Sequence, residues 1–415
     1  MKLKFDKLTI ILYIILVVFG WVNIYAACYN ESHALIWDME QQHGKQLLWI
    51  GFALFVAMAT LFIEPKFFAQ GSYIIYGFTL LLLIATLIIG TATHGNQAWI
   101  NIGPFKLQSS EFAKFGTALA VAKYMSGLDI DIKKRNVQIA VALLIAIPMG
   151  LVLLQHDTGS ALVFLSFVIP LYREGLSPAL FVIGAVAVIL FVLSLLINQY
   201  LLMGIVLALC LFYLFGWLNK RTRRHYLYTL GVLAACCLFI FSVDFTFEHV
   251  LEPHQQSRIY VLLGKTDDIK AAGYNQHQSK IAIGSGGLIG KGFLKGTITK
   301  ADFVPEQETD FIFCTVAEEW GFVGSTLLLV AYVVLLVHLV TMAERQRSAF
   351  ARFYGYSVAG ILFMHLFVNV GMVLGLLPVI GIPLPFFSYG GSSLLAFTLM
   401  LFIFIRQDAE RNNLL

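Results

Sequence analysis

The sequence predicts an all-α, polytopic integral membrane protein with about twelve transmembrane helices. Of its 415 residues, 59% are hydrophobic and only 13% are charged, and the mean hydropathy is +0.81. Soluble proteins carry about 25% charged residues, so this composition argues against a soluble core. The apolar sequence is interrupted by one long polar stretch, residues 244–310.

A helix needs about 20 mostly apolar residues to cross a bilayer. Runs of this kind lie at 8–28, 46–64, 70–90, 110–126, 136–154, 159–173, 178–197, 200–218, 226–243, 311–341, 353–377 and 385–405. The number of spans is least certain between 159 and 243, where one run is short and two others are almost continuous. The first run is long and lacks a small-residue cleavage site, so we expect a true span and no cleaved signal peptide. With no internal repeat, we expect residues 1–415 to form a single transmembrane domain.

The distribution of Lys and Arg in short loops predicts the orientation. With the amino terminus in the cytoplasm, twelve spans place the basic clusters Lys133–Arg135 and Lys220–Arg224 inside, whereas the short outer loops hold only Lys45 and Lys106. We therefore expect a cytoplasmic (inner) membrane protein with both termini in the cytoplasm and residues 244–310 outside. The net charge of +4 follows this topology and does not indicate a nucleic-acid partner.

The cysteines and histidines predict neither a disulfide framework nor a metal centre. The five cysteines include no CxxC pair, and neither His254 nor His277 has ligand spacing around it. We therefore expect no metal site built from protein side chains alone.

The polar stretch 244–310 is expected to be a large extracytoplasmic loop that carries the catalytic site. Its polar groups would lack partners in lipid, and long loops are usually functional. It ends at Asp310, directly before the apolar run FIFCTVAEEWGFVG. A partly desolvated carboxylate at this junction is a candidate general base. The alternative is a helix N-cap, a role for which Thr309 competes.

Two further polar clusters lie at the outer ends of predicted spans. In AWINIGPFKLQSSEFAKF, Trp99 precedes Glu111 and Lys114, which are three residues apart and so share one helix face. In QHDTG, Asp157 precedes a short span. Charged residues at membrane depth indicate a functional site. The structural alternatives are a Trp interface anchor with an intrahelical ion pair, and an N-cap for Asp157.

The segment LLPVIGIPLPFFSYGGSS at 376–393 predicts a break in the helical pattern. Its prolines and glycines prevent a regular helix, so it must be covered by protein or water. We expect Asn369 in the preceding span to be its polar partner and Ser388 within it to contact substrate. All of these clusters fall in the outer half of the membrane, which predicts one outward-opening polar cavity.

The glycine-rich sequence GSGGLIGKG at 284–292 resembles a phosphate loop but lacks its first glycine and its final Ser or Thr. Its glycines are better explained by tight turns and close backbone approach to a ligand. Exposed N–H groups together with Arg258, Lys280 and Lys291 are candidates to bind an anionic diphosphate. The alternative is a flexible turn with solvated lysines.

Taken together, the motifs resemble those of the SEDS family of cell-wall polymerases, and its RodA branch more closely than FtsW. The matching stretches are AWINIGPFKLQSSEFAKF, QHDTGSALV, AAGYNQHQSKIAIGSGGLIGKGF, VPEQETDFIF with AEEWGFVGS, and NVGMVLGLLPVIGIPLPFFSYGGSS. They occur in the family's order and cover most of the chain from about residue 91 onward.

The resemblance implies a peptidoglycan glycosyltransferase that polymerises lipid II into glycan strands on the outer face of the cytoplasmic membrane during cell elongation. It implies inversion at the anomeric carbon and release of undecaprenyl diphosphate. It also implies a class B penicillin-binding protein and other membrane proteins of the elongation machinery as partners. The resemblance implies that Asp310 corresponds to the family's catalytic Asp. Its other functional positions match Trp99, Glu111, Lys114 and Asp157.

The chain departs from the family pattern beside several of these residues. Ala98 stands where a basic residue is common, Ser109 where Pro is usual, His156 where Pro precedes the Asp, and Glu308 where His is common. The family is usually described with ten spans, so a surplus pair is expected within 178–243.

The implied chemistry needs no organic cofactor but leaves room for a divalent cation, Mg²⁺ or Mn²⁺, opposite the departing diphosphate. Two other functions remain open at this point. One is a lipid II flippase with Glu111, Lys114 and Asp157 along its path. The other is a non-catalytic scaffold for a penicillin-binding protein.

Overall fold

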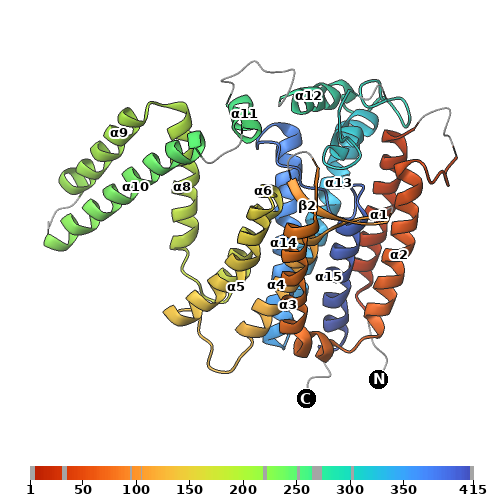
Figure 1. Cartoon of the computed structure of the whole chain (residues 1–415), viewed down its shortest axis with the longest axis horizontal. Helices are drawn as coiled ribbons and strands as arrows, with labels where there is room; N and C mark the ends of the chain where they lie inside the picture. The colour runs from red at the N-terminus through yellow and green to blue at the C-terminus, as the bar shows by residue number, and fades with distance from the viewer. Residues whose placement is uncertain are drawn as a thin grey trace. The chain divides into compact units, whose positions relative to one another are not determined.

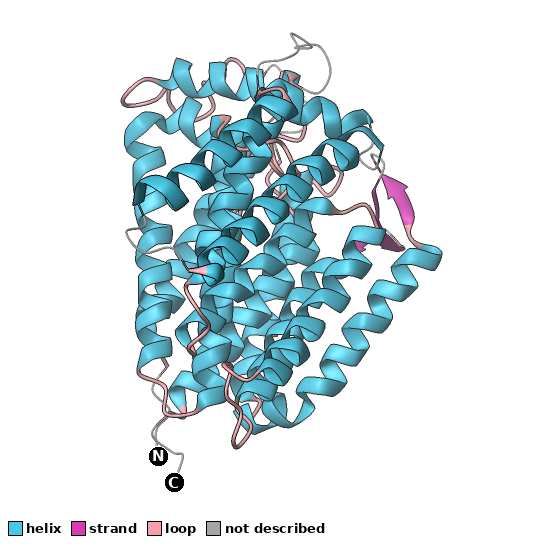
Figure 2. Cartoon of the chain, turned by 90° about the vertical axis from the view of Figure 1, so that its left-hand side faces the viewer, coloured by secondary structure: helices cyan, strands magenta, loops and turns pink. Residues whose placement is uncertain are grey.

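The computed structural model describes residues 5–29, 35–93, 96–103, 105–217, 222–249, 253–263, 273–300 and 303–411. Nearly all of this is helical, with one small sheet (Figure 2). Each of the twelve predicted apolar runs coincides with helix. Among the described residues, ten helices are long and apolar enough to cross a membrane. The other two runs form a 17-residue helix and a shorter helical stretch at Thr158–Arg173.

The chain divides into two compact units, Met1–Leu176 with Tyr274–Leu415, and Ser177–Gly273. The first unit contains these helices: α1 (Lys7–Ala27), α2 (Gln42–Phe62), α3 (Pro65–Ile89), α4 (Ser109–Met125), α5 (Arg135–Leu154), α6 (Thr158–Val163), α7 (Val168–Arg173), α12 (Tyr274–Gly286), α13 (Ile312–Glu344), α14 (Ala349–Leu374) and α15 (Gly391–Ala409). A 3₁₀ turn, Phe164–Phe167, joins α6 to α7.

The centre of the first unit is formed by α4, α14 and α15 (Figure 1). In the most apolar windows of α14 and α15, 72% and 83% of residues are buried, against 22% for α2 and α5. The outer helices expose large apolar side chains such as Phe55 and Ile74. In a membrane such side chains face lipid, so the polar residues of the central helices are enclosed by protein.

A three-stranded antiparallel sheet precedes α4, where no strands were expected. It consists of β1 (Thr91–Thr93), β2 (Asn96–Ile102) and β3 (Phe105–Gln108), in the order β1-β2-β3. β-Branched and aromatic residues favour these strands, and Gly103 takes the positive φ of 61° that a tight turn uses. The sheet places Trp99 opposite Gln108, one residue before α4 begins.

In the polar stretch 244–310, the described residues up to Gly286 are mostly helical and those after it form turns, and the stretch is shared between the units. Its first residues complete α10 (Arg223–His249), and α11 (Pro253–Leu262) and α12 follow. Only the part from Tyr274 onward belongs to the unit that contains Asp310.

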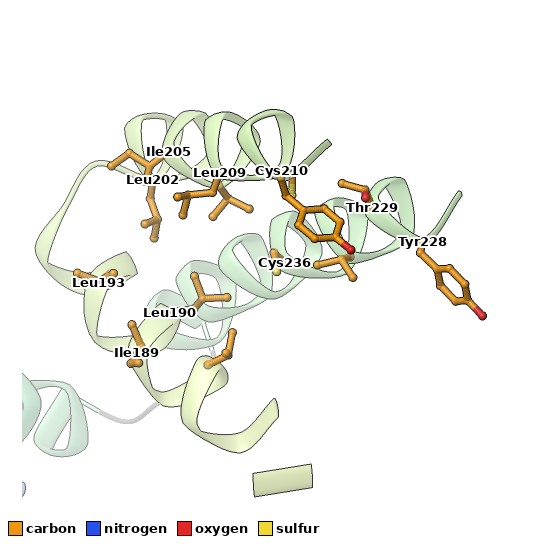
Figure 3. A pocket seen from close by; sticks show the side chains of 14 residues that line it. Ile189, Leu190, Leu193, Leu202, Ile205, Leu209, Cys210, Tyr228, Thr229 and Cys236 are labelled. Carbon is orange, nitrogen blue, oxygen red and sulfur yellow. The ribbon is translucent and has the colours of Figure 1, made fainter. Parts of the chain in front are cut away.

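The second unit consists of α8 (Ala179–Leu196), α9 (Gln199–Phe212), a π-helical turn at Tyr213–Trp217, α10 and α11. It contains an open apolar pocket of about 550 Å³ between α8, α9 and α10 (Figure 3). Side chains such as Leu190, Leu202 and Cys236 line it. The lining residues include no charged side chain, so this pocket is not a candidate catalytic site.

Candidate active site

Asp310 lies two residues before the start of α13, and it is half-buried. Its backbone N–H donates to Glu306 O at 3.1 Å, which closes a tight turn. The N-cap position of α13 is Phe311, so neither Asp310 nor Thr309 occupies it.

Residues 376–390, here called the irregular segment, run between α14 and α15 without regular structure, as predicted. The Asn369 side-chain amide, on α14, donates to Asp310 O at 2.8 Å and to Ile382 O at 2.7 Å. One buried side chain thus joins the Asp310 turn to this segment, which confirms the predicted partnership. A Cβ added at Gly381 would lie 3.2 Å from Asp310 Oδ2, so the carboxylate lies directly beside Gly381.

Several other buried groups hold the irregular segment in place. The hydroxyl of Tyr332 on α13 donates to Pro385 O at 2.5 Å. Ser388, which is 4% exposed, accepts from Leu384 N at 2.8 Å. Its position indicates support of the segment's own backbone, and a contact of Ser388 with substrate stays a prediction.

Glu111 and Lys114 form a buried ion pair on α4, as their spacing predicts. Lys114 Nζ lies 2.7 Å from Glu111 Oε1, and neither side chain is more than 1% exposed. Lys114 Nζ also lies 2.8 Å from Nε2 of His365 on α14, and 5.7 Å from the centre of the Phe397 ring. The Lys114 charge is therefore neutralised and hydrogen-bonded within the protein.

Asp157 caps α6, as the structural alternative predicted, and it also joins three elements. Its Oδ1 accepts from Ser160 N at 2.9 Å. Its Oδ2 accepts from Gln108 Nε2 at 3.0 Å and from Ser110 Oγ at 3.2 Å. Because Gln108 pairs with Trp99 in the sheet, Asp157 connects the Trp99 hairpin to α4 and α6.

The three basic candidates are in different situations. Lys280, on α12, is exposed and lies against Gly375 at the end of α14. Lys291 Nζ is 2.6 Å from Glu318 Oε1 and 2.6 Å from Thr297 Oγ1, so it already has two partners. Arg258 lies on α11 of the second unit.

The glycine-rich sequence is built into a break in α13. At Gly321 the helix has φ 67° and ψ −162°. Residues 287–292, here called the inserted loop, supply the missing backbone partners on both sides of this break. Two helix N–H groups donate to the loop, and two loop N–H groups donate to the helix: Phe322 N to Gly287 O, Val323 N to Leu288 O, Lys291 N to Glu318 O and Gly292 N to Glu319 O, at 2.9–3.1 Å.

This arrangement explains the glycines without a bound anion. A Cβ at Gly290 would overlap the carbonyl of Glu319, and a Cβ at Gly321 would overlap the backbone of Gly290. The close backbone approach is thus made to helix α13 and not to the ligand that the sequence analysis expected. The buried Glu318 carboxylate completes the junction by accepting from the N–H groups of Thr297, Ile298 and Thr299.

Two residues at the site were missed by the sequence analysis. His365 bonds Lys114 on one side and Pro383 O on the other. Gln42, on α2, donates to Glu308 Oε1 at 2.5 Å and so holds the residue that departs from the family pattern. A signal for His365 did exist, because it lies four residues before Asn369 on one face of an apolar helix.

Comparison with known families decides the relationship. A family model described as cell cycle protein, covering FtsW, RodA and SpoVE, matches residues 6–207 and 202–413. The chain belongs to this family. It is 33% identical over 395 residues to the peptidoglycan glycosyltransferase MrdB of Escherichia coli K12, covering 95% of this chain and 90% of MrdB. It is 31% identical to the peptidoglycan glycosyltransferase RodA of Treponema pallidum, covering 94% of each.

A solved structure agrees with this relationship. A chain from a study of how a peptidoglycan synthase complex coordinates polymerization and crosslinking matches with a TM-score of 0.73 and 28% identity, over 99% of both chains. The resemblance noted in the sequence is confirmed, and the chain is a multi-pass membrane protein.

Proposed function

We propose that this chain is a peptidoglycan glycosyltransferase that polymerises lipid II into glycan strands. The observation that carries the proposal is the position of Asp310. This half-buried residue has its carboxylate beside Gly381, and its backbone carbonyl is held by the Asn369 amide. The enzymatic activity named for the relatives at 33% and 31% identity supports it.

In the proposed mechanism Asp310 is the general base. Its carboxylate accepts the proton of the 4-hydroxyl of the acceptor sugar. The resulting oxygen nucleophile forms a bond to the anomeric carbon of the diphosphate-linked chain, and the bond from that carbon to the diphosphate oxygen breaks. A single displacement of this kind inverts the anomeric configuration. A positioned base contributes roughly 10²–10⁴-fold to the rate.

The departing undecaprenyl diphosphate needs positive charge nearby. Of the lysines proposed for this role, Lys114 and Lys291 are paired with Glu111 and Glu318, whereas Lys280 is exposed where α14 meets the irregular segment. We therefore favour Lys280 as the protein cation on the first unit. Arg258 lies on the second unit, and its role stays a prediction from the sequence.

A divalent cation is the other candidate for this role. No group of three His, Cys, Asp or Glu side chains gathers as a metal site among the residues that the structure describes. Mg²⁺ is often held by one or two carboxylates together with substrate phosphates, an arrangement that needs no such group. The proposed mechanism routes no step through the ion.

The proposed setting follows from the topology. The basic loops predict cytoplasmic termini and an outer-face position for Asp310, where lipid II would be used. The partner would be a class B penicillin-binding protein, in line with the synthase complex from which the structural neighbour comes. Other elongation proteins would assemble with this pair.

The proposal is tested by polymerisation of purified lipid II, with and without divalent ions and the partner. We expect Asp310→Asn to remove the activity, because the amide keeps the shape but cannot accept the proton. Asp131→Asn, an exposed acidic residue between α4 and α5, is the matched control and should keep the parental rate. Lipid II flipping in liposomes without polymerisation would favour the flippase instead. Strand synthesis by the complex that is unaffected by Asp310→Asn would favour the scaffold.

A further inference from the structure

His365 is a buried histidine with a partner on each ring nitrogen. Its side chain is enclosed on α14, at 1% exposure. Nε2 lies 2.8 Å from Lys114 Nζ, and Nδ1 lies 3.1 Å from Pro383 O. A lysine ammonium only donates and a carbonyl only accepts, so the ring accepts at Nε2 and donates at Nδ1. The two contacts therefore specify the neutral ring with its proton on Nδ1.

The next turn of α14 holds the neighbouring peptide group. Asn369, four residues after His365, donates to Ile382 O, and Ile382 directly precedes Pro383. The same amide donates to Asp310 O. Two side chains on one helix face thus fix two consecutive carbonyls of the irregular segment, one residue beyond Gly381, which lies against the Asp310 carboxylate.

A continuous set of contacts therefore runs from α4 to the proposed base. It begins at the Glu111–Lys114 ion pair, passes through His365 to Pro383, and reaches Asp310 through Ile382 and Asn369. The side chains of Glu111, Lys114, His365, Asn369 and Ile382 are buried, and Pro383 is half-buried. Proline at 383 offers no N–H of its own, so its carbonyl is the group by which this residue can be held.

We propose that His365 is a positioning residue that connects the buried ion pair of α4 to the irregular segment and so fixes Gly381 against the Asp310 carboxylate. The proposal rests on the function proposed above, in which Asp310 is the base. His365 touches no reacting atom. Its effect is on the orientation of the base, so it acts on the chemical step and leaves substrate affinity unchanged.

Two conservative variants separate the two contacts of the ring. His365→Asn keeps a donor near the position of Nδ1, toward Pro383 O, and removes the acceptor for Lys114. His365→Gln keeps an acceptor near the position of Nε2, for Lys114, and removes the donor to Pro383 O. Ser357→Ala is the matched control, because Ser357 is buried on the same helix and bonds only Phe353 O of that helix.

The assay is steady-state polymerisation of lipid II by purified protein. Each variant is first shown to be monodisperse and to have the melting temperature of the parent. We expect His365→Gln to lower kcat by about 10- to 100-fold with KM within about twofold, because small misplacements of catalytic groups cost up to about 10²-fold. His365→Asn should retain more activity than His365→Gln, and Ser357→Ala should match the parent.

Other outcomes overturn the inference in distinct ways. A rise in KM at unchanged kcat would make His365 a substrate contact. Loss of activity in His365→Asn with full activity in His365→Gln would mean that only the Lys114 contact matters. Parental rates in both variants would leave the histidine no role beyond packing. Full activity of Asp310→Asn would instead refute the proposed function, so the two failures are distinguishable.

Discussion

The insertion of a glycine-rich loop into α13 predicts a large difference between neighbouring glycines. Gly290 has a φ of +80°, and a Cβ there would overlap the carbonyl of Glu319. A side chain in left-handed backbone costs about 1–2 kcal/mol. Relieving the overlap requires the loop to move away from α13. That movement breaks the hydrogen bonds from Lys291 N to Glu318 O and from Gly292 N to Glu319 O, at about 1 kcal/mol each. Gly290→Ala should therefore lower the free energy of unfolding by about 3–4 kcal/mol.

Two glycines of the same stretch provide matched controls. Gly287 has a φ of +59° but no atom within 4 Å of its added Cβ, so Gly287→Ala incurs the backbone strain alone, about 1–2 kcal/mol. Gly284 lies in α12 with open space around it and no positive φ. Gly284→Ala should stabilise the protein slightly, by about 0.5–1 kcal/mol, because Ala is the better helix former.

The measurement is the midpoint of thermal unfolding of the purified protein in one detergent. The expected order of midpoints is Gly284→Ala at or above the parent, then Gly287→Ala, then Gly290→Ala several degrees below. If the Gly290→Ala and Gly287→Ala variants have the same midpoint of thermal unfolding, the inserted loop does not pack against α13 as described, and the reasoning fails.

Two further predictions concern acidic residues. Glu318→Gln should lower the melting midpoint by several degrees, because the carboxylate accepts several buried hydrogen bonds and pairs with Lys291. Glu319→Gln should shift it less, because the described residues give that buried carboxylate no hydrogen bond of normal geometry and only the backbone N–H groups of Leu294 and Gly296 face it. Equal losses in both variants would contradict this. Burial raises the pKa of Asp6, but hydrogen bonds from Thr9 and His338 have a larger, opposite effect. The net result is a pKa lowered from the ordinary 3.8 to about 2. This lowered pKa stabilises the fold above about pH 4 and is lost as the pH falls toward about 2. Melting midpoints across this range should therefore fall more steeply for the parent than for Asp6→Asn, and parallel curves would refute the assignment.

The helices could be predicted from the sequence because lipid imposes a simple rule on them. Every apolar run of sufficient length became a helix, including the ambiguous pair around Asn198. The irregular segment was also predictable, because its prolines and glycines exclude a helix. The start of the last span was not predictable. Apolar residues such as Phe386 and Phe387 extend the apolar run back to residue 385, whereas α15 begins at Gly391.

The parts that the sequence did not reveal depend on contacts between distant residues. Lys291 carries an ordinary signature of an anion-binding lysine, but its pairing with Glu318 is visible only once the inserted loop meets α13. The sheet at 91–108 consists of strands too short to show a clear period beside apolar helices. His365 looks like an isolated core histidine until α4 brings Lys114 against it.

The role of Asp310 is the central claim, and one comparison tests it most directly. Purified parent and Asp310→Asn proteins are supplied with lipid II and the partner synthase, and the rate of glycan strand formation is measured. We predict a fall of at least about 10²-fold in Asp310→Asn, the lower end of the contribution of a general base, with the melting midpoint of the parent retained. Strand formation by Asp310→Asn at the parental rate would contradict the assignment of Asp310 as the base.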